Sequence, residues 1–262
     1  MTNRKATELD YFYAALMFYT RIPVPSSALH SQTVLDRSRK YFPLIGVIIG
    51  SIAAATFLVA NHFFAAALSI ALSMALSLLA TGAFHEDGLA DSCDGLGGGW
   101  TKEQVLTIMK DSRLGTYGAA ALILVLGVKF LSLLEIVSKS TPLLFLLAYI
   151  AAHTLSRTLS SSMIDLFDYV QDIDSSKIKP ITEKNLSTKD KLVSVSITAL
   201  PIIALAGLAP AATVFACLAC CVVALSFMAY SRSRIGGYTG DVLGAIQQFS
   251  ELTFYLSLAA AL

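Results

Sequence analysis

Three aspartates that follow residue 84 have the type and spacing of a metal site. The segment reads Phe84-His-Glu-Asp-Gly-Leu-Ala-Asp-Ser-Cys-Asp-Gly-Leu-Gly-Gly-Gly99. At about 100° per residue, Asp87, Asp91 and Asp94 fall within roughly 60° of one another on one helical face. Converging carboxylates repel unless a cation neutralises them. Because no histidine or thiolate has matching spacing, these oxygens favour Mg²⁺, Mn²⁺ or Ca²⁺ over Zn²⁺, and we expect Asp87, Asp91 and Asp94 to hold one of these cations.

A fourth acid adjoins this cluster. Glu86 lies about 100° from Asp87 around the helix, which makes it a candidate further ligand or base. The alternative for the whole cluster is a solvated helix end that leads into a glycine-rich loop. We favour a site, because the acids adjoin a long apolar run, where burying a charge is costly, and share one helical face.

A second polar cluster, Lys110-Asp-Ser-Arg-Leu-Gly-Thr-Tyr-Gly118, brings both signs of charge together before another apolar run. Lys110 and Arg113 are natural phosphate partners, since the arginine fork can hold two phosphate oxygens while lysine acts as a point charge. Asp111 is a candidate catalytic acid beside them. The alternative is that both cations anchor a helix in anionic lipid headgroups.

The third cluster is Arg232-Ser-Arg-Ile-Gly-Gly-Tyr-Thr-Gly-Asp-Val-Leu-Gly-Ala245. We take Arg232 as a candidate substrate-binding cation and Asp241 as a candidate catalytic acid. Asp241, Gln248 and Glu251 share a helical face, and Glu251 lies roughly 15 Å beyond Asp241. An unpaired carboxylate this far into the membrane is energetically costly, which predicts a substrate-binding or paired role for Glu251.

His153 and Arg157 form a similar pair one helical turn apart, near the end of an apolar run. Two interpretations stay open for them. Either side chain could take part in function, or both could serve interhelical hydrogen bonding to Glu251 or another acid.

Apolar helices must position these residues. Hydrophobic residues make up 55% of the chain and charged residues 14%, and the mean hydropathy of +0.68 is that of a membrane protein. The formal net charge of +1 offers no field that would attract nucleic acid. A spanning helix needs about 20 mostly apolar residues. Six stretches come close, and a seventh is more polar: 42–60, 63–84, 117–137, 142–159, 192–208, 211–230 and 241–262.

We therefore expect an all-α fold, a polytopic transmembrane helical bundle of about six to seven spanning helices, as one integral membrane domain over residues 1–262. The apolar run within residues 9–20 is short and aromatic, and it ends at Arg21-Ile-Pro-Val-Pro25. A helix that lies in the interface or re-enters it fits this run better than a full span.

The turns between these stretches predict an orientation. Three short turns, at 61–62, at 138–141 and near Pro210, share one side of the bundle, and the long loops share the other. The side with the long loops receives most of the cations: Arg37, Arg39, Lys40, Lys102, Lys110, Arg113, Lys177, Lys179, Lys184, Lys189, Lys191, Arg232 and Arg234. By the positive-inside rule this side faces the cytoplasm. Most acidic residues fall on the same side, so we expect an active site at the cytoplasmic face of the inner membrane.

Taken together, these motifs resemble the cobalamin synthases, also called adenosylcobinamide-GDP ribazoletransferases. The resemblance extends over nearly the whole chain. It rests on the clusters above and on two earlier motifs, Arg21-Ile-Pro-Val-Pro25 and Tyr41-Phe-Pro-Leu-Ile-Gly46. It implies a magnesium-dependent transfer of the cobinamide phosphate of adenosylcobinamide-GDP onto α-ribazole or its 5′-phosphate. The products would be adenosylcobalamin or its 5′-phosphate, with release of GMP.

The resemblance also assigns roles to the clusters. Asp87, Asp91 and Asp94 would hold Mg²⁺, and Lys110 and Arg113 would hold the diphosphate. The attacking hydroxyl would be oriented by one of three acids: Glu86, Asp111 or Asp241. The stretch Asp87-Gly-Leu-Ala-Asp91 is also similar to the start of the CDP-alcohol phosphotransferase motif, but that motif has arginine where this chain has Asp91. The difference argues against a phospholipid synthase.

A cation-coupled transporter is the competing hypothesis, because intramembrane acids and glycine-interrupted helices also describe transport pathways. It predicts acids near the bilayer midplane and an internal repeat. This sequence instead concentrates its acids at one interface and shows no repeat. The expected partners are the lipid bilayer and the two small-molecule substrates, and the sequence leaves oligomerisation open.

Overall fold

The computed structural model describes residues 5–26, 28, 31–170, 181 and 186–262, and most of these residues lie in helices. These residues contain no strand beyond one isolated bridge between Tyr169 and Tyr238. Three of the cations in the predicted cytoplasmic loops, Lys177, Lys179 and Lys184, lie outside the described residues. The elements in order are α1 Glu8–Tyr19, α2 Gln32–Ser38, η1 Arg39–Tyr41, α3 Phe42–Asn61, α4 Ala66–Thr81, α5 Phe84–Gly98, α6 Lys102–Lys110, α7 Thr116–Lys139, α8 Pro142–Leu166, α9 Thr188–Ala206, α10 Pro210–Ile235 and α11 Gly240–Ala261.

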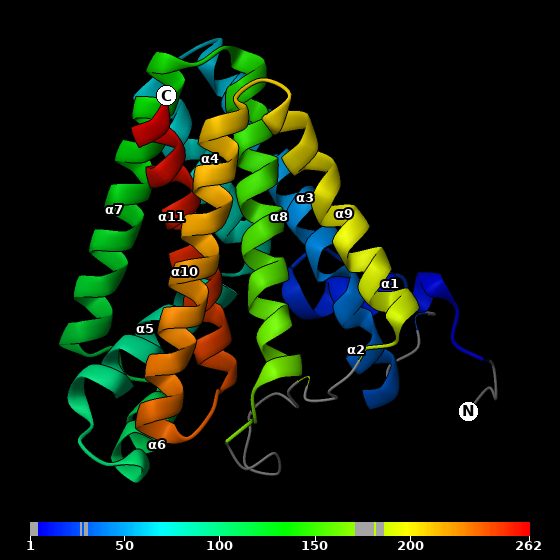
Figure 1. The fold of residues 1–262 in the computed structure, drawn as a ribbon, viewed down its shortest axis with the longest axis vertical. Coiled ribbons are helices and arrows are strands. Elements are labelled where there is room, and N and C mark those ends of the chain that lie inside the picture. The colour runs from blue at the N-terminus through cyan, green and yellow to red at the C-terminus, as the bar shows by residue number, and fades with distance from the viewer. Residues whose placement is uncertain (1–4, 27, 29–30, 171–180, 182–185) are drawn as a thin grey trace.

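The long helices run roughly side by side along the longest axis of the molecule (Figure 1). Helix α11 lies inside the bundle and packs against α5, α7, α8 and α10. Most of its residues are buried, including polar ones. The shorter helices α1, α2, α5 and α6 lie toward one end of the molecule, away from the three tight turns (Figure 1). An all-α membrane bundle, as predicted, is therefore confirmed.

Fewer helices meet the length and composition of a membrane span than the six to seven predicted. Four do so among the described residues, or five if the bent pair α4 and α5 counts as one span. Helix α9 falls short because it opens with charged residues, and α11 because it carries carboxylates and glutamines. The short N-terminal helix α1 has 12 residues, as the predicted interfacial helix requires.

The predicted continuous span over 63–84 is wrong at its end. Helix α4 stops at Thr81, and the chain bends by 88° before α5 begins at Phe84. Gly82 and Ala83 both adopt left-handed backbone conformations, with φ of 67° and 55°. Such a conformation ends a helix, and it is uncommon for a residue with a side chain such as Ala83. As a result, the acidic segment forms its own helix across the end of the bundle.

A polar cluster around two buried cations, which we call the N-terminal clasp, ties α1 and η1 to α8 and α9. It consists of Glu8, Arg39, Lys40, Asp165 and Asp190. The Lys40 ammonium lies 2.7 Å from both Glu8 Oε2 and Asp190 Oδ1, and Arg39 Nη2 lies 2.6 Å from Asp165 Oδ1. Since Arg39 and Lys40 are almost fully buried, they depend on these carboxylates for compensation.

The clasp changes the acidity of its carboxylates. The hydrogen bond from Lys40 holds the pKa of Glu8 below its ordinary 4.5. Burial alone would raise the pKa of Asp190, but hydrogen bonds from Lys40 and Ser187 outweigh burial and hold it below the ordinary 3.8. Both carboxyl groups are therefore ionised in the folded protein at neutral pH.

The predicted arrangement of the turns is confirmed. Figure 1 shows the turns α3–α4, α7–α8 and α9–α10 together at one end of the bundle, near the C-terminus. At that end Lys139 Nζ donates to the carbonyl oxygen of Ala259, 3.1 Å away. Which end faces the cytoplasm stays a prediction.

Candidate active site

Helix α5 carries the three spaced aspartates across the end of the bundle and packs against α6, α7 and α11. All three lie within one unbroken α-helix, so the predicted helical register is confirmed. Their surroundings differ sharply. Asp87 is exposed, Asp91 is half-buried and Asp94 is buried.

Asp94 contacts the start of α7. Its Oδ2 accepts a hydrogen bond from the Gly115 backbone nitrogen at 2.7 Å, and its Oδ1 accepts one from Gly118 at 2.8 Å. These amides belong to the first turn of α7, where backbone N–H groups lack helical partners and carboxylates are favoured. A Cβ at either glycine would lie 2.4 Å from an Asp94 oxygen, so a side chain there would displace the Asp94 carboxylate. Asp94 thereby joins the acidic helix to the polar segment that precedes α7.

These contacts bear on how the three aspartates could bind a metal. Among the residues that the structure describes, no three His, Cys, Asp or Glu side chains are grouped to hold a metal ion. Each Asp94 oxygen accepts one backbone hydrogen bond and keeps a second lone pair, so the predicted ligand role of Asp94 stays a prediction. Asp87 and Asp91 do fit chemically, since they are hard oxygen donors one helical turn apart at the accessible end of the bundle.

Asp241 is brought beside the aspartates by a close crossing of two helices. A Cβ at Gly88 would lie 3.0 Å from the Asp241 Cα and 3.3 Å from the Gly244 Cα. Small residues permit such an approach between α5 and α11. The half-buried Asp241 in the first turn of α11 therefore lies next to the turn of α5 that carries Asp87 and Asp91.

The predicted phosphate-binding segment lies between α6 and α7. Arg113 is highly exposed, and its Nη2 lies 2.6 Å from Asp111 Oδ2. The Arg113 Nε also donates to Asp111, at 3.0 Å and 3.1 Å from its two oxygens. Lys110 at the end of α6 is exposed too. Because solvent-exposed ion pairs contribute little stability, Arg113 can exchange Asp111 for a phosphate at low cost.

The C-terminal end of α10 closes another side of the same region. Arg232 is exposed, with its guanidinium 6.0 Å from the centre of the Phe167 ring. Arg234 donates to the carbonyl oxygens of Leu96 and Gly99, at 3.3 Å and 2.5 Å. These contacts secure the end of α5. The sequence analysis named Arg234 only among the cations of the long loops and gave it no role in the site.

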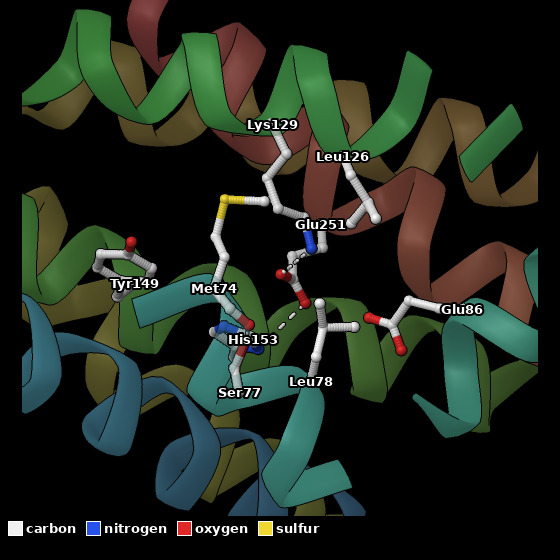
Figure 2. A pocket seen from close by; sticks show the side chains of 9 residues that line it. All are labelled: Met74, Ser77, Leu78, Glu86, Leu126, Lys129, Tyr149, His153 and Glu251. Atoms are coloured by element: carbon white, nitrogen blue, oxygen red, sulfur yellow. Dashed lines mark hydrogen bonds and ion pairs between the residues drawn. The ribbon is translucent and has the colours of Figure 1, made fainter. Parts of the chain in front are cut away.

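Glu251 lies apart from this surface, inside the bundle (Figure 2). Only 1% of its side chain is exposed. Lys129 Nζ from α7 lies 2.8 Å from Glu251 Oε1, and His153 Nδ1 from α8 lies 3.1 Å from Oε2. Gln247 Nε2 donates to Oε2 at 2.7 Å. The predicted paired role of Glu251 is confirmed, and its predicted contact with substrate stays a prediction.

The interhelical interpretation is confirmed for His153, which contacts Glu251 from α8, and a functional role for His153 or Arg157 stays a hypothesis. Arg157 Nη1 lies 3.8 Å from Glu251 Oε2 and donates to the His153 carbonyl oxygen at 3.0 Å. Lys129 was missed. A lone lysine in the middle of the apolar run 117–137 was the available signal, because intramembrane charges are rare unless they are paired.

Glu86 is the residue that connects the interior to the acidic helix. Its Oε1 accepts a hydrogen bond from Gln248 Nε2 at 2.8 Å, while its Oε2 is buried without a hydrogen-bond partner among the described residues. A small cavity, with room for about one water molecule, is lined by Glu86, Lys129, His153 and Glu251 together with Ser77, Tyr149 and apolar side chains (Figure 2).

The predicted site residues thus form two connected groups. The outer group lies at the accessible end of the bundle and contains Asp87, Asp91, Asp94, Lys110, Asp111, Arg113, Arg232 and Asp241. The inner group, Glu86 and Glu251, is buried and linked through Gln248 and Lys129. Helix α5 belongs to both, because Glu86 and Asp87 are neighbours in its first turn.

Comparison with known proteins gives consistent matches. Over residues 11–259 the chain matches the sequence model of the family described as Cobalamin-5-phosphate synthase. An adenosylcobinamide-GDP ribazoletransferase from Shewanella frigidimarina (strain NCIMB 400) is 44% identical over 253 residues, which cover 97% of this chain and 95% of the relative. The protein of the same name from Vibrio cholerae serotype O1 (strain ATCC 39315 / El Tor Inaba N16961) is 43% identical, with 97% and 95% covered.

A third protein of that name, from Leptothrix cholodnii (strain ATCC 51168 / LMG 8142 / SP-6), is 40% identical, with 97% of this chain and 96% of the relative covered. No solved structure matches the chain. Since the family match spans nearly all of α1 to α11, the chain belongs to the Cobalamin-5-phosphate synthase family.

Proposed function

We propose that this protein is an adenosylcobinamide-GDP ribazoletransferase that completes cobalamin from adenosylcobinamide-GDP and α-ribazole or its 5′-phosphate. The family match and the names of relatives at 40–44% identity support this reaction. The observation that carries the proposal at the level of the site is the Asp94 contact. It holds the acidic helix against the Lys110–Arg113 segment, so carboxylates and phosphate-binding cations meet at one end of the bundle.

The reaction exchanges one phosphorus–oxygen bond for another. A ribose hydroxyl of α-ribazole other than the 5′ one, which carries the phosphate in the 5′-phosphorylated substrate and keeps it in the product, attacks the phosphorus of the cobinamide phosphate. The phosphoanhydride bond to GMP breaks, and the hydroxyl proton passes to a carboxylate. Lys110 and Arg113 bind the diphosphate, with Arg113 exchanging its Asp111 partner for phosphate oxygens. Arg232, exposed at the end of α10, adds a further cation.

Three acids are candidates to orient the attacking hydroxyl, as the sequence indicated. Asp241 is the one we favour, because it is half-buried beside the turn of α5 that carries Asp87 and Asp91. Asp111 is held by Arg113, and Glu86 is held inside the bundle by Gln248. In this assignment Glu86 supports the geometry of α5.

Magnesium belongs to this proposal. Asp87 and Asp91 would hold the ion, with water and substrate phosphate oxygens completing its shell, and Asp94 would anchor α7 instead. When bound, the ion would neutralise negative charge that develops on the phosphate oxygens during transfer.

Location also belongs to the proposal. We place the site at the cytoplasmic face of the inner membrane. The excess of Lys and Arg at the end of the bundle opposite the tight turns supports this orientation.

GMP release tests the proposal directly. Purified protein in detergent, given adenosylcobinamide-GDP and α-ribazole, should release GMP only with Mg²⁺. Asp91→Ala should lower the rate by about 100-fold or more. Glu135→Ala, which removes an exposed acid at the opposite end of α7, should leave it unchanged. A folded wild type that releases no GMP would contradict the proposal.

The buried Lys129–Glu251 pair is the observation that keeps a cation-coupled transporter as the second candidate. The detergent assay separates the two functions, because transport requires a sealed compartment and group transfer does not. If the wild type shows no turnover in detergent, uptake into sealed vesicles becomes the measurement to make.

A further inference from the structure

The polar groups inside the bundle form a continuous chain of contacts that ends at the acidic helix. It starts at Glu251, which is joined to Lys129 at 2.8 Å. Lys129 Nζ also donates to Gln248 Oε1 at 3.3 Å, and Gln248 Nε2 donates to Glu86 Oε1 at 2.8 Å. Each member is at least nine-tenths buried. The chain therefore crosses from α7 through α11 to the first turn of α5.

Each contact in this chain fixes the next. A glutamine amide can turn over and exchange its oxygen for its nitrogen, and its neighbours decide which orientation is stable. Lys129 can only donate, so it holds the Gln248 oxygen toward α7. The Gln248 nitrogen is thereby directed to Glu86 and also to Gln247 Oε1, which lies 2.8 Å away.

Glu86 has little else to hold its side chain. Its second oxygen has no hydrogen-bond partner among the described residues and faces the small cavity (Figure 2). A buried acid with one protein donor is sensitive to the loss of that donor. Glu86 precedes Asp87 directly, at the start of a helix whose preceding backbone includes the left-handed Ala83.

We infer that Lys129 is a positioning residue for the transfer reaction, which acts through Gln248 and Glu86 to fix the first turn of α5 and the carboxylate of Asp87. Lys129 lies within the bundle and does not touch the outer group of site residues. The inference rests on the proposed function for its effect on catalysis. Its structural part, the placement of α5, can be measured without substrate.

The catalytic test compares Lys129→Met and Gln248→Leu with wild type in the GMP-release assay. Displacing a positioned group by a small distance can cost about 100-fold in rate, so we expect kcat to fall by about 10-fold to 100-fold in both variants. The KM for either substrate should change less than about twofold, because the groups that bind the diphosphate stay in place. Lys129→Arg keeps a buried cation that can donate, and it should recover most of the rate.

Because both substitutions break the same chain, their effects should not multiply. The double variant should be no slower than the slower single variant. Lys139→Met is the matched control, since it removes a lysine from the last turn of α7, where Lys139 contacts Glu135 and Ala259. It should keep the wild-type kcat.

The structural test uses Cys93, a half-buried residue of α5. In a background where Cys217, Cys220 and Cys221 are alanine, the rate of Cys93 alkylation reports how firmly α5 is held. This rate should rise in Lys129→Met and Gln248→Leu and stay unchanged in Lys129→Arg and Lys139→Met. The alkylation rate can be measured without turnover, so it still tests the placement of α5 if the proposed reaction does not occur.

Three results would overturn the inference: Cys93 alkylation that is unchanged in both variants, a rise in KM with kcat intact, or single effects that multiply in the double variant. If Lys129→Met does not yield folded protein, Gln248→Leu alone decides. It removes no charge and leaves the Lys129–Glu251 pair intact.

Discussion

The Oδ1 atom of Asp94 lies 2.8 Å from the backbone nitrogen of Gly118, so the last of the three spaced aspartates on α5 caps the first turn of α7. The helix N-terminus favours a carboxylate, and the carboxylate is fixed in return. This contact makes Asp94 different in kind from Asp87 and Asp91, although all three share a spacing that suggests one role.

Replacing Asp94 by asparagine tests that difference. The amide keeps the shape but offers one oxygen acceptor and no charge, so we expect a loss of about 1–2 kcal/mol in stability. The rate of GMP release should fall, while the Mg²⁺ concentration for half-maximal rate stays at the wild-type value. Thermal unfolding in detergent and a Mg²⁺ titration measure the two effects.

Asp91→Asn is the comparison variant. It should leave thermal unfolding close to wild type and raise the Mg²⁺ requirement, because it weakens a proposed metal ligand. An equal rise in the Mg²⁺ requirement of Asp94→Asn would show that Asp94 binds the ion after all.

A second prediction concerns the glycine that faces Asp94. An alanine Cβ at Gly118 would lie 2.4 Å from Asp94 Oδ2 and 2.8 Å from the Ala90 carbonyl oxygen. We expect Gly118→Ala to separate α5 from α7 and to cost about 1–3 kcal/mol in stability, measured by thermal unfolding.

Gly127 supplies the control in the same helix. A Cβ there meets nothing within 4 Å. Gly127→Ala should be neutral or stabilise the protein by up to about 1 kcal/mol, because alanine favours the helix. Equal destabilisation by both substitutions would rule out the close contact as the cause.

Much of the fold could be predicted from the length of the apolar runs. The stretches 42–60 and 117–137 correspond to α3 and α7, which end within two residues of the predicted bounds. The break after Thr81 could not be predicted in this way, because Gly82 and Ala83 continue an apolar run in composition. Their left-handed conformations only become apparent from the backbone.

The same limit applies to the candidate site, where features within one helix were easier to predict than contacts between helices. Spacing correctly predicted that the three aspartates of α5 share one helix, because helical geometry is local. A paired role for Glu251 was predicted, but its partner Lys129 was not, since the two residues are far apart in sequence and meet only after α7 packs on α11. The capping role of Asp94 depends on the direction that α5 takes after the bend, which the sequence does not specify.

A third prediction concerns Arg113 as a phosphate ligand. Its side chain is 87% exposed, so Arg113→Ala should change stability by less than about 0.5 kcal/mol. The KM for adenosylcobinamide-GDP should rise by roughly 10-fold, because the bidentate phosphate contact is lost, and Arg113→Lys should recover only part of it.

Steady-state kinetics with varied adenosylcobinamide-GDP measures this effect. Lys189→Ala, an exposed cation in the first turn of α9, is the control for the loss of surface charge. A similar rise in KM in both variants would point to a general electrostatic effect instead of a contact.

The last prediction is the pH dependence of the N-terminal clasp. Lys40→Met removes the ammonium that lies 2.7 Å from both Glu8 and Asp190. Arg37 still contacts Asp190, so we expect the variant to fold. Its free energy of unfolding at pH 7 should be lower than that of wild type by about 1–3 kcal/mol. Thermal unfolding of wild type and variant from pH 7 down to pH 3 measures this difference.

The sign of the pH effect follows from the lowered pKa values. A carboxyl group whose folded pKa lies below its unfolded value stabilises the protein fully above the unfolded value and loses this contribution as pH falls through the folded pKa. The ordinary values are 4.5 for Glu8 and 3.8 for Asp190, and both are lowered in the clasp. The difference between wild type and Lys40→Met should therefore be constant from pH 7 to about 5 and shrink below 4.5. A difference that stays constant down to pH 3 would mean that Lys40 stabilises the protein through packing alone.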